Sequence, residues 1–324
     1  MLFGMSRLGT SIAWLRRARE AVPEADRRVL LNPLRLAARF ATFAARRATH
    51  TDRPLPADDV TLRDPALVEL LVDGFRMVAR DYFRFEVEGV ENVPATGPVL
   101  LVGNHSGALL PLDGFFASIA LHDRYGGERV PFALVHDFVF DDPLLRSYAA
   151  RLGMLRAGHS GAQHAFSRGH VVLVFPGSDQ DAFRPFRDRN KVVLAGRTGF
   201  LKLALREKVP IVPVVSAGTH EQLVVLSRGE RLAKLVHAHA WARADVFPIV
   251  LSVPWGITSG FLPYVPLPTQ VTQAFLPSVD VSSFGPDAAD DPAVLARLYG
   301  QIEGAMQATL DRLTHGRRFL LGRR

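Results

Sequence analysis

Short apolar segments alternate with helix-length segments through the middle of the chain, and this alternation limits the possible folds more than any other feature. Strand-like runs occur at residues 99–102, 130–136, 153–157, 170–177 and 209–215. Helical patterns occur at residues 65–83, 111–121, 143–152, 160–168, 194–207 and 292–313. Short runs that are apolar throughout are typical of strands buried on both faces. The alternation therefore predicts an α/β fold in which helices cover a mainly parallel central sheet.

The charged residues divide the chain into two parts. Residues 1–50 carry ten arginines and three acidic residues, and this excess of seven equals the net charge of the whole 324-residue chain. The rest of the chain is therefore neutral overall. We expect residues 1–63 to form a basic amphipathic helical segment with a linker that contains Pro and Asp. Residues 64–324 would then form the main domain, which is long enough to bury a large core.

Basic and apolar side chains interleave near the end of the N-terminal part. The apolar ones are Leu30, Leu31, Leu34, Leu36, Phe40 and Phe43, and the basic ones are Arg35, Arg39, Arg46 and Arg47. Basic amphipathic helices bind the headgroup layer of anionic bilayers. A solvated helical face is the alternative. Nucleic acid is not expected as a partner, because the segment has no recognition motif and the main domain has no basic excess.

An apolar stretch at residues 247–268 is the second candidate for contact with lipid. It contains Pro248, Pro254, Pro263, Pro266 and Pro268, a density that an isolated membrane-spanning helix would not tolerate. Buried strands and turns, or an apolar surface that touches lipid, fit the stretch better. We find no secretory signal. With no cysteine in the chain, a peripheral location on the cytoplasmic face of a membrane is the natural expectation.

Two loops follow predicted strands, where active sites of parallel sheets lie. In the first loop, residues 103–110, His105 stands among Asn104, Ser106 and Gly107, which allow a ligand close to the backbone. A histidine can accept a proton near neutral pH, and a carboxylate can orient it and stabilise its charged form. Asp113 is the nearest candidate for this carboxylate.

The spacing of His105 and Asp113 leaves two interpretations open. On one continuous helix, eight positions would separate the two residues by about 12 Å, so a catalytic pair requires the chain between them to fold back. In the alternative, His105 closes a turn while Asp113 stabilises the N-terminus of the following helix.

The second loop, residues 176–191, carries several basic side chains. Arg184, Arg187 and Lys191, with backbone amides around Pro176, Gly177 and Ser178, would suit a phosphate or an anionic thioester carrier. A solvated polar loop is the alternative, because Asp179, Asp181 and Asp188 balance much of the charge. We predict no metal site, since the pairs His237 with His239 and His159 with His164 have no third ligand at a suitable spacing.

Four ordered segments together resemble the phospholipid/glycerol acyltransferase family, over residues 82–280. They are VEGVENVPATGPVLLVGNH, PLLRSYAARLGMLRA, GHVVLVFPGS and KVPIVPVVSAG. Two departures resemble the monoacylglycerol/diacylglycerol acyltransferase-like branch. Seven residues separate His105 from Asp113, more than in the usual block, and the usual Phe-Pro-Glu-Gly block reads Phe175-Pro176-Gly177-Ser178. Asp181-Ala182 stands where that branch has Glu-Ala.

The resemblance implies a glycerolipid acyltransferase-like fold and direct transfer of an acyl group from acyl-CoA or acyl carrier protein (acyl-ACP) to a hydroxyl of a glycerolipid or lysophospholipid. No other cofactor is implied. His105 would act as general base and Asp113 would orient it. Asn104, Ser106, Gly107, Phe175, Pro176, Gly177, Ser178, Asp181, Arg184, Arg187 and Lys191 would line the substrate site. Backbone amides near Gly177 would stabilise the oxyanion. A non-catalytic lipid-binding protein and a lipid or thioester hydrolase are the alternatives.

Overall fold

The computed structural model describes residues 2–30, 32, 34–35, 38, 58–106, 111–136, 138–141, 143–237 and 246–323. Most of the interleaved basic and apolar stretch at residues 30–47, and Gly107 of the first loop, lie outside these residues.

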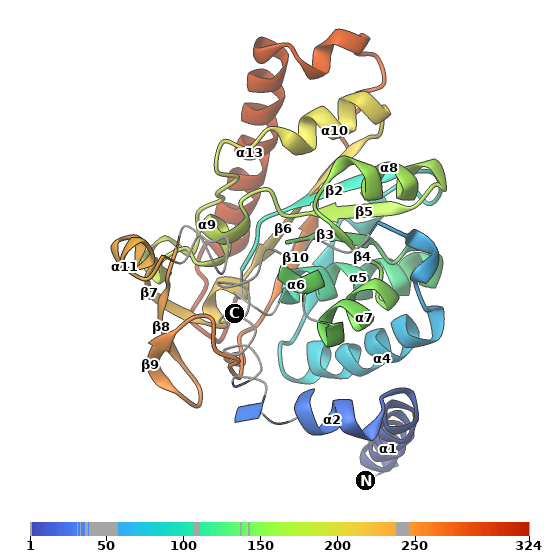
Figure 1. Cartoon of the computed structure of the whole chain (residues 1–324), viewed down its shortest axis with the longest axis vertical. Helices are drawn as coiled ribbons and strands as arrows, with labels where there is room; N and C mark the ends of the chain where they lie inside the picture. Colours follow the sequence, from blue (N-terminus) through green and yellow to red (C-terminus); the bar gives the residue numbers. More distant parts are fainter. Residues whose placement is uncertain are drawn as a thin grey trace.

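A seven-stranded sheet forms the centre of the molecule (Figure 1). Its spatial order is β1 (Glu86–Glu88), β10 (Thr272–Phe275), β6 (Ile211–Ala217), β2 (Val99–Gly103), β5 (Val171–Val174), β3 (Phe132–Val135) and β4 (Met154–Arg156). All neighbouring strands are parallel except β10 and β6. The prediction of a mainly parallel sheet is therefore confirmed, and the antiparallel pair is the one exception within it.

Alternating side chains of the central strand β2 point into two separate cores. Leu100 and Val102 pack with α8 (His159–Ser167), α10 (Gly199–Glu207) and α13 (Pro292–Thr314). Val99 and Leu101 pack with α5 (Leu112–Tyr125), which α4 (Pro65–Asp81) covers in turn. Every residue of β2 is buried. This burial explains why the strand is apolar throughout instead of alternating with polar residues.

Two of the helices begin with the same local chemistry. The side chains of Asp64 and Asp291 accept hydrogen bonds from backbone amides in the first turns of α4 and α13, and a proline follows each aspartate. This satisfies amides that have no partner inside the helix. The predicted helix from residue 194 instead begins at Gly199. Ala195 and Gly196 have φ angles of 57° and 65°, which a right-handed helix does not admit.

The remaining short elements connect these layers. They are α6 (Phe138–Asp141), α7 (Pro143–Arg151), α9 (Ser178–Ala182) and the 3₁₀ helices η1 (Val60–Leu62), η2 (Val90–Asn92), η3 (Gly127–Arg129), η4 (Phe186–Asp188), η5 (Thr219–Glu221) and η6 (Pro286–Ala289).

The N-terminal helices α1 (Leu2–Ala21) and α2 (Glu24–Leu30) lie beside α4 at the lower end of the view in Figure 1. The Trp14 indole N–H donates to the Leu70 carbonyl oxygen at 2.7 Å, and Arg17 pairs with Asp73 at 3.1 Å. Gly74 leaves the space that the Trp14 ring fills. Helix α1 is therefore docked on the main domain. Among the described residues, no helix combines the length and the apolar character needed to cross a membrane.

A second, three-stranded antiparallel sheet stands to one side of the central sheet (Figure 1, left). It consists of β7 (Val224–Ser227), β8 (Ile249–Ser252) and β9 (Gly256–Ser259), and α11 (Glu230–Leu235) follows β7. Val225 and Val250 point into a small core with Leu223 and Tyr264. Much of the apolar stretch at residues 247–268 thus forms strands and turns, in agreement with one of its two interpretations.

Candidate active site

The first loop is fixed at the carboxyl end of β2 by contacts with β6. The Asn104 side chain accepts a hydrogen bond from the Ser216 amide at 2.8 Å and donates one to the Ser216 carbonyl oxygen at 3.1 Å. These two bonds imitate another rung of the parallel sheet. Because they occupy both ends of the buried Asn104 amide, Asn104 holds the loop in place and does not face a substrate, contrary to the prediction.

The structure brings His105 and Asp113 together. His105 Nδ1 lies 3.5 Å from Asp113 Oδ2, and the Asp113 side chain is fully buried at the start of α5. The same Oδ2 accepts hydrogen bonds from the Ser106 amide at 2.8 Å and the Ser106 hydroxyl at 2.9 Å. Among the described residues, His105 Nδ1 and Asp113 Oδ1 have no hydrogen-bond partner.

A second buried carboxylate fixes the backbone of His105. Asp181 Oδ2 accepts the His105 amide at 2.5 Å, and Asp181 also forms a fully buried ion pair with Arg184. Burial raises the pKa of Asp181 to about 6, although Arg184 and the His105 amide oppose the rise. Asp181 and Arg184 are thus parts of the support under His105. The expectation that Arg184 faces an anionic substrate is wrong, because its side chain is 1% exposed.

His220 holds the other side of the His105 backbone and was missed in the sequence. Its Nε2 lies 2.8 Å from the His105 carbonyl oxygen, and a carbonyl only accepts, so Nε2 carries the proton. Burial lowers the pKa of His220 well below its usual value, which keeps the ring neutral. The adjacent Glu221 forms a buried ion pair with Arg317 at 3.0 Å. Both residues follow β6, so the rule that sites lie beyond strand ends could have pointed to them.

Phe175 determines the position of the His105 ring. The two rings stack with centroids 4.6 Å apart and an angle of 21° between their planes. Gly103 makes room for this stack, since a Cβ atom there would lie 2.6 Å from the Phe175 ring. Gly177 is required for a similar reason, because a Cβ would meet the Val193 carbonyl oxygen and the Asp181 side chain.

The basic residues of the second loop differ in their exposure to solvent. Arg187 and Lys191 reach the surface with side chains 84% and 66% exposed, and both pair with Asp188. Pro176 accepts a hydrogen bond from Arg197 through its carbonyl oxygen. The Ser178 amide donates to the Phe175 carbonyl oxygen at 3.1 Å and so closes the turn. Because this amide is engaged in the turn, it is not among the backbone amides near Gly177 that could stabilise an oxyanion.

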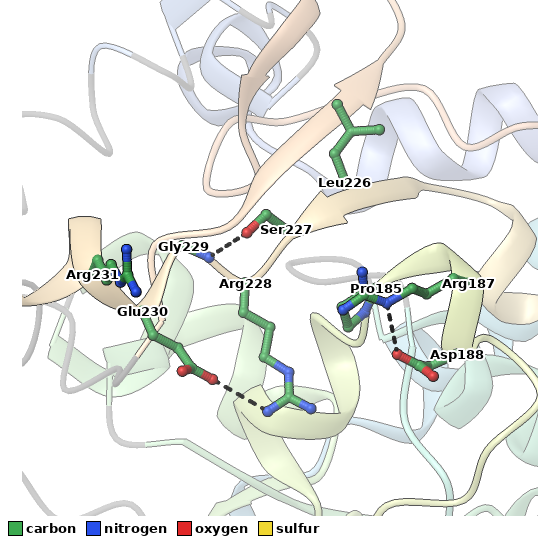
Figure 2. Close-up of a pocket in the computed structure, with 9 residues that line it drawn as sticks. All are labelled: Pro185, Arg187, Asp188, Leu226, Ser227, Arg228, Gly229, Glu230 and Arg231. Atoms are coloured by element: carbon green, nitrogen blue, oxygen red, sulfur yellow. Dashed lines mark hydrogen bonds and ion pairs between the residues drawn. The ribbon is translucent and has the colours of Figure 1, made fainter.

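A hollow of about 520 Å³ lies where the second loop meets the small sheet (Figure 2). Its lining consists of Pro185, Arg187, Asp188, Leu226, Ser227, Arg228, Gly229, Glu230 and Arg231. Three guanidinium groups and two carboxylates therefore gather around one depression. Arg228 and Arg231 follow β7, which the sequence did not predict as a strand, so only Arg187 was among the expected site residues.

Beyond the carboxyl end of β2, the available chemistry is proton transfer at His105. Asp113 lies on the Nδ1 side of the ring, so Nε2 points to the opposite side, and the side chain is 14% exposed. An imidazole held by stacking and by two backbone contacts can accept a proton from a hydroxyl, and the buried carboxylate would stabilise the charge that results.

The chain is similar to known acyltransferases. The family model described as Acyltransferase matches residues 84–217, which hold His105, Asp113 and Asp181. An uncharacterised protein of Mycobacterium leprae is 35% identical over 256 residues, 79% of this chain and 67% of that protein. Human "Diacylglycerol O-acyltransferase 2" is 27% identical over 149 residues, 44% of this chain and 38% of that protein.

A solved structure is also similar. The crystal structure of the 1-acyl-sn-glycerophosphate acyltransferase PlsC from Thermotoga maritima has a TM-score of 0.47 and 17% identity, and covers 86% of this chain and 90% of that one. The family match defines an enzyme of lipid metabolism that transfers acyl groups. The chain belongs to the acyltransferase family, with distant sequence similarity to diacylglycerol acyltransferases. It spans about two thirds of the length of the mycobacterial relative.

Proposed function

We propose that this protein transfers a fatty acyl group from an acyl thioester to a hydroxyl of a glycerolipid or lysophospholipid. The observation that carries the proposal is the approach of His105 Nδ1 to the Asp113 carboxylate, within 3.5 Å at the edge of the sheet. The name of the human relative, a diacylglycerol acyltransferase, supports a glycerolipid acceptor.

The proposed reaction is a direct transfer. His105 Nε2 takes the proton from the acceptor hydroxyl as its oxygen attacks the thioester carbonyl carbon. The C–S bond then breaks, and the leaving thiolate receives the proton from the imidazolium. Asp113 orients the ring through Nδ1–H and stabilises its positive charge during the reaction. No covalent acyl-enzyme is formed, because the Ser106 hydroxyl donates to Asp113 and is not activated by the ring.

The proposal also includes the acyl donor and the location of the protein. We propose acyl-CoA or acyl-ACP as donor, and a peripheral position on the cytoplasmic face of an anionic membrane, where the acceptor is found. The basic residues of α1 and α2, Arg16, Arg17, Arg19, Arg27 and Arg28, support the membrane surface as a partner.

Acyl transfer can be tested with purified protein, radiolabelled acyl-CoA and a panel of lysophospholipids and acylglycerols. We expect one acceptor class to give a labelled ester, and His105→Ala to remove the activity. The chain offers a matched control, because the tetrapeptide His-Ser-Gly-Ala occurs again at the exposed His159. His159→Ala should retain full activity. Equal activity in His105→Ala and wild type would contradict the proposal.

A further inference from the structure

The small sheet of β7, β8 and β9 has two apolar faces, of which the described residues cover only one. Val225 and Val250 point inward and are 2% and 1% exposed. On the other face, Leu251 and Ile257 are direct cross-strand neighbours and are 48% and 71% exposed. An antiparallel sheet with one solvated face normally has polar side chains on that face. This outer face therefore lacks the composition of a surface that meets only water.

The exposed apolar area extends beyond this pair. Val253 and Val265, which form an isolated bridge, are 48% and 52% exposed. Fifteen large apolar side chains are exposed in the described part of the chain, and seven of them fall between residues 226 and 265. This clustering distinguishes the region from the scattered apolar residues found on any protein surface.

Trp255 occupies the turn between β8 and β9. Its indole N–H donates to the Pro263 carbonyl oxygen at 2.5 Å, and the residue is half-buried. A tryptophan ring has an apolar body and one polar end, which suits the boundary between water and lipid. The tip of the hairpin thus has the composition of a segment that enters the headgroup region.

Basic residues border the apolar face. Strand β7 connects the apolar face to the hollow of Figure 2. Val224 on β7 pairs with Leu251 of the apolar face, and Leu226 and Arg228, further along the chain, line the hollow. Arg187 and Arg231 extend from opposite sides of this hollow, and Lys234 follows on α11. Arginine guanidinium groups bind phosphate oxygens through paired hydrogen bonds. The two carboxylates of the hollow, Asp188 and Glu230, lie 3.5 Å from Arg187 and Arg228, so the three guanidinium groups leave the hollow with a net positive charge.

The small sheet also lies directly against the active site. The Phe261 ring packs on Phe183 with centroids 5.6 Å apart, and Phe183 stands between Asp181 and Arg184 in the chain. Burial raises the pKa of Tyr264, and the negative charge of Asp113 adds to this effect, so Tyr264 is close enough to respond to that carboxylate. A lipid surface on the small sheet would therefore lie next to the reacting groups.

We propose that the small sheet docks on an anionic lipid bilayer, with the outer face of β8 and β9 in the interface and the arginine hollow on a lipid phosphate. The choice of a bilayer over a protein partner follows from the arginines beside the apolar face and from the tryptophan at its tip. This inference rests on the proposed function, because the bilayer would supply the lipid acceptor. Membrane contact can be measured without any acyl transfer, so the two proposals can fail separately.

The chain lacks cysteine, so Ile257→Cys provides a single thiol for an environment-sensitive fluorophore on the full-length protein. Vesicles of phosphatidylcholine with phosphatidylglycerol should shift the emission to shorter wavelength, and a lipid-borne quencher should quench it. The same label at Leu62→Cys, an equally apolar and 49% exposed position on η1, should show neither change. This site-specific readout separates the small sheet from any binding by the N-terminal segment.

Binding of the unlabelled chain to the same vesicles tests the apolar face and the arginine hollow separately. Leu251→Ser with Ile257→Ser should weaken binding at least tenfold. Arg228→Gln with Arg231→Gln should weaken it about tenfold in low salt, and this loss should be smaller with phosphatidylcholine alone, which has the phosphate but no net negative charge. Lys202→Gln with Arg206→Gln on α10, in the upper part of Figure 1 and away from the small sheet, is the charge-matched control and should have no effect.

Three results would overturn the proposal. A label at residue 257 that stays in water on bound protein would show that the sheet does not touch the bilayer. Loss of self-association in the Leu251→Ser with Ile257→Ser variant, with vesicle binding unchanged, would assign the face to a second copy of the chain. A raised KM for acyl-CoA in the arginine variants, with vesicle binding unchanged, would assign the hollow to the donor phosphates.

Discussion

The two sheets of this protein differ in how their apolar faces are covered and in where their polar side chains lie. The central sheet is covered by helices on both faces, and its polar side chains gather beyond the carboxyl ends of β2, β5 and β6. Their hydrogen bonds fix one histidine. The small sheet has a covered apolar face and an exposed apolar face, and the charged residues stand at its border. We therefore assign the chemistry to the first sheet, and contact with the phase that holds the acceptor to the second.

Burial serves different purposes in the two sheets. At the central edge, burial removes water from the carboxylates Asp113 and Asp181, so their interactions with His105 act in a medium of low polarity. At the small sheet, an apolar surface is left unburied. Changes at the central edge should therefore affect catalysis and folding strongly, whereas changes on the outer face should weaken membrane binding and leave the free energy of unfolding nearly unchanged.

The largest effect is expected from removing the charge of Asp113. Asp113→Asn keeps the size of the side chain but cannot stabilise an imidazolium at His105, so kcat should fall about 10²- to 10⁴-fold. Steady-state kinetics with saturating acceptor measures this change. An Asp113→Asn protein with wild-type kcat would assign Asp113 to the support of the loop through Ser106 alone.

Removing Asp181 should cost the most stability. Asp181→Ala leaves the buried Arg184 without its partner and the His105 amide without its acceptor, so the free energy of unfolding should fall by about 3–5 kcal/mol. Urea unfolding followed by circular dichroism measures the loss. Asp290→Ala removes an exposed partner of Arg206 and serves as the matched control, for which we expect no measurable change. Similar midpoints for the two variants would contradict the structural role of Asp181.

The neutral His220 should make the fold sensitive to acid. Its pKa is lowered in the folded state, so below about pH 6.5 the unfolded chain binds more protons there, and stability decreases by up to about 1.4 kcal/mol per pH unit. His220→Gln can still donate to the His105 carbonyl oxygen but does not titrate. The difference in unfolding free energy between wild type and His220→Gln should therefore change between about pH 7 and about pH 5.5. Asp181 has a raised pKa and acts in the opposite sense, but it is present in both proteins. A constant difference would show that folding leaves the pKa of His220 unchanged.

The smallest effects should distinguish the two faces of the small sheet. Val250→Ala removes inward-facing methyl groups and should cost about 2 kcal/mol of unfolding free energy. Leu251→Ala, the next residue on the outer face, should cost less than about 0.5 kcal/mol. Thermal unfolding of the two variants in the same buffer measures both. Equal costs would mean that the outer face is covered in solution.

Much of this architecture could be predicted from the sequence because the central strands are apolar throughout. The runs at residues 99–102 and 209–215 fall on β2 and β6, and the pairing of His105 with Asp113 was predicted as one of two possibilities. The small sheet was harder to predict. Its strands are only four residues long, so no period of alternation can be recognised in them.

The burial of the groups around His105 could not be predicted from the sequence. Arg184 and Arg187 are three positions apart in one polar loop, yet one is 1% and the other 84% exposed. The difference arises because Asp181 supplies a carboxylate inside the protein, and only the fold places that carboxylate beneath His105. His220 was missed for the same reason, since its partner is a backbone oxygen 115 residues away.

Direct acyl transfer by His105 is the central claim, and the balance of products tests it most directly. Thiol released from acyl-CoA and ester formed on a vesicle-borne acceptor should be measured together, for wild type and for His105→Ala. We predict equal amounts of thiol and ester in wild type, dependence of both on the acceptor, and neither product above background in His105→Ala. Thiol release with free fatty acid in place of ester, or unchanged ester formation by His105→Ala, would contradict direct transfer.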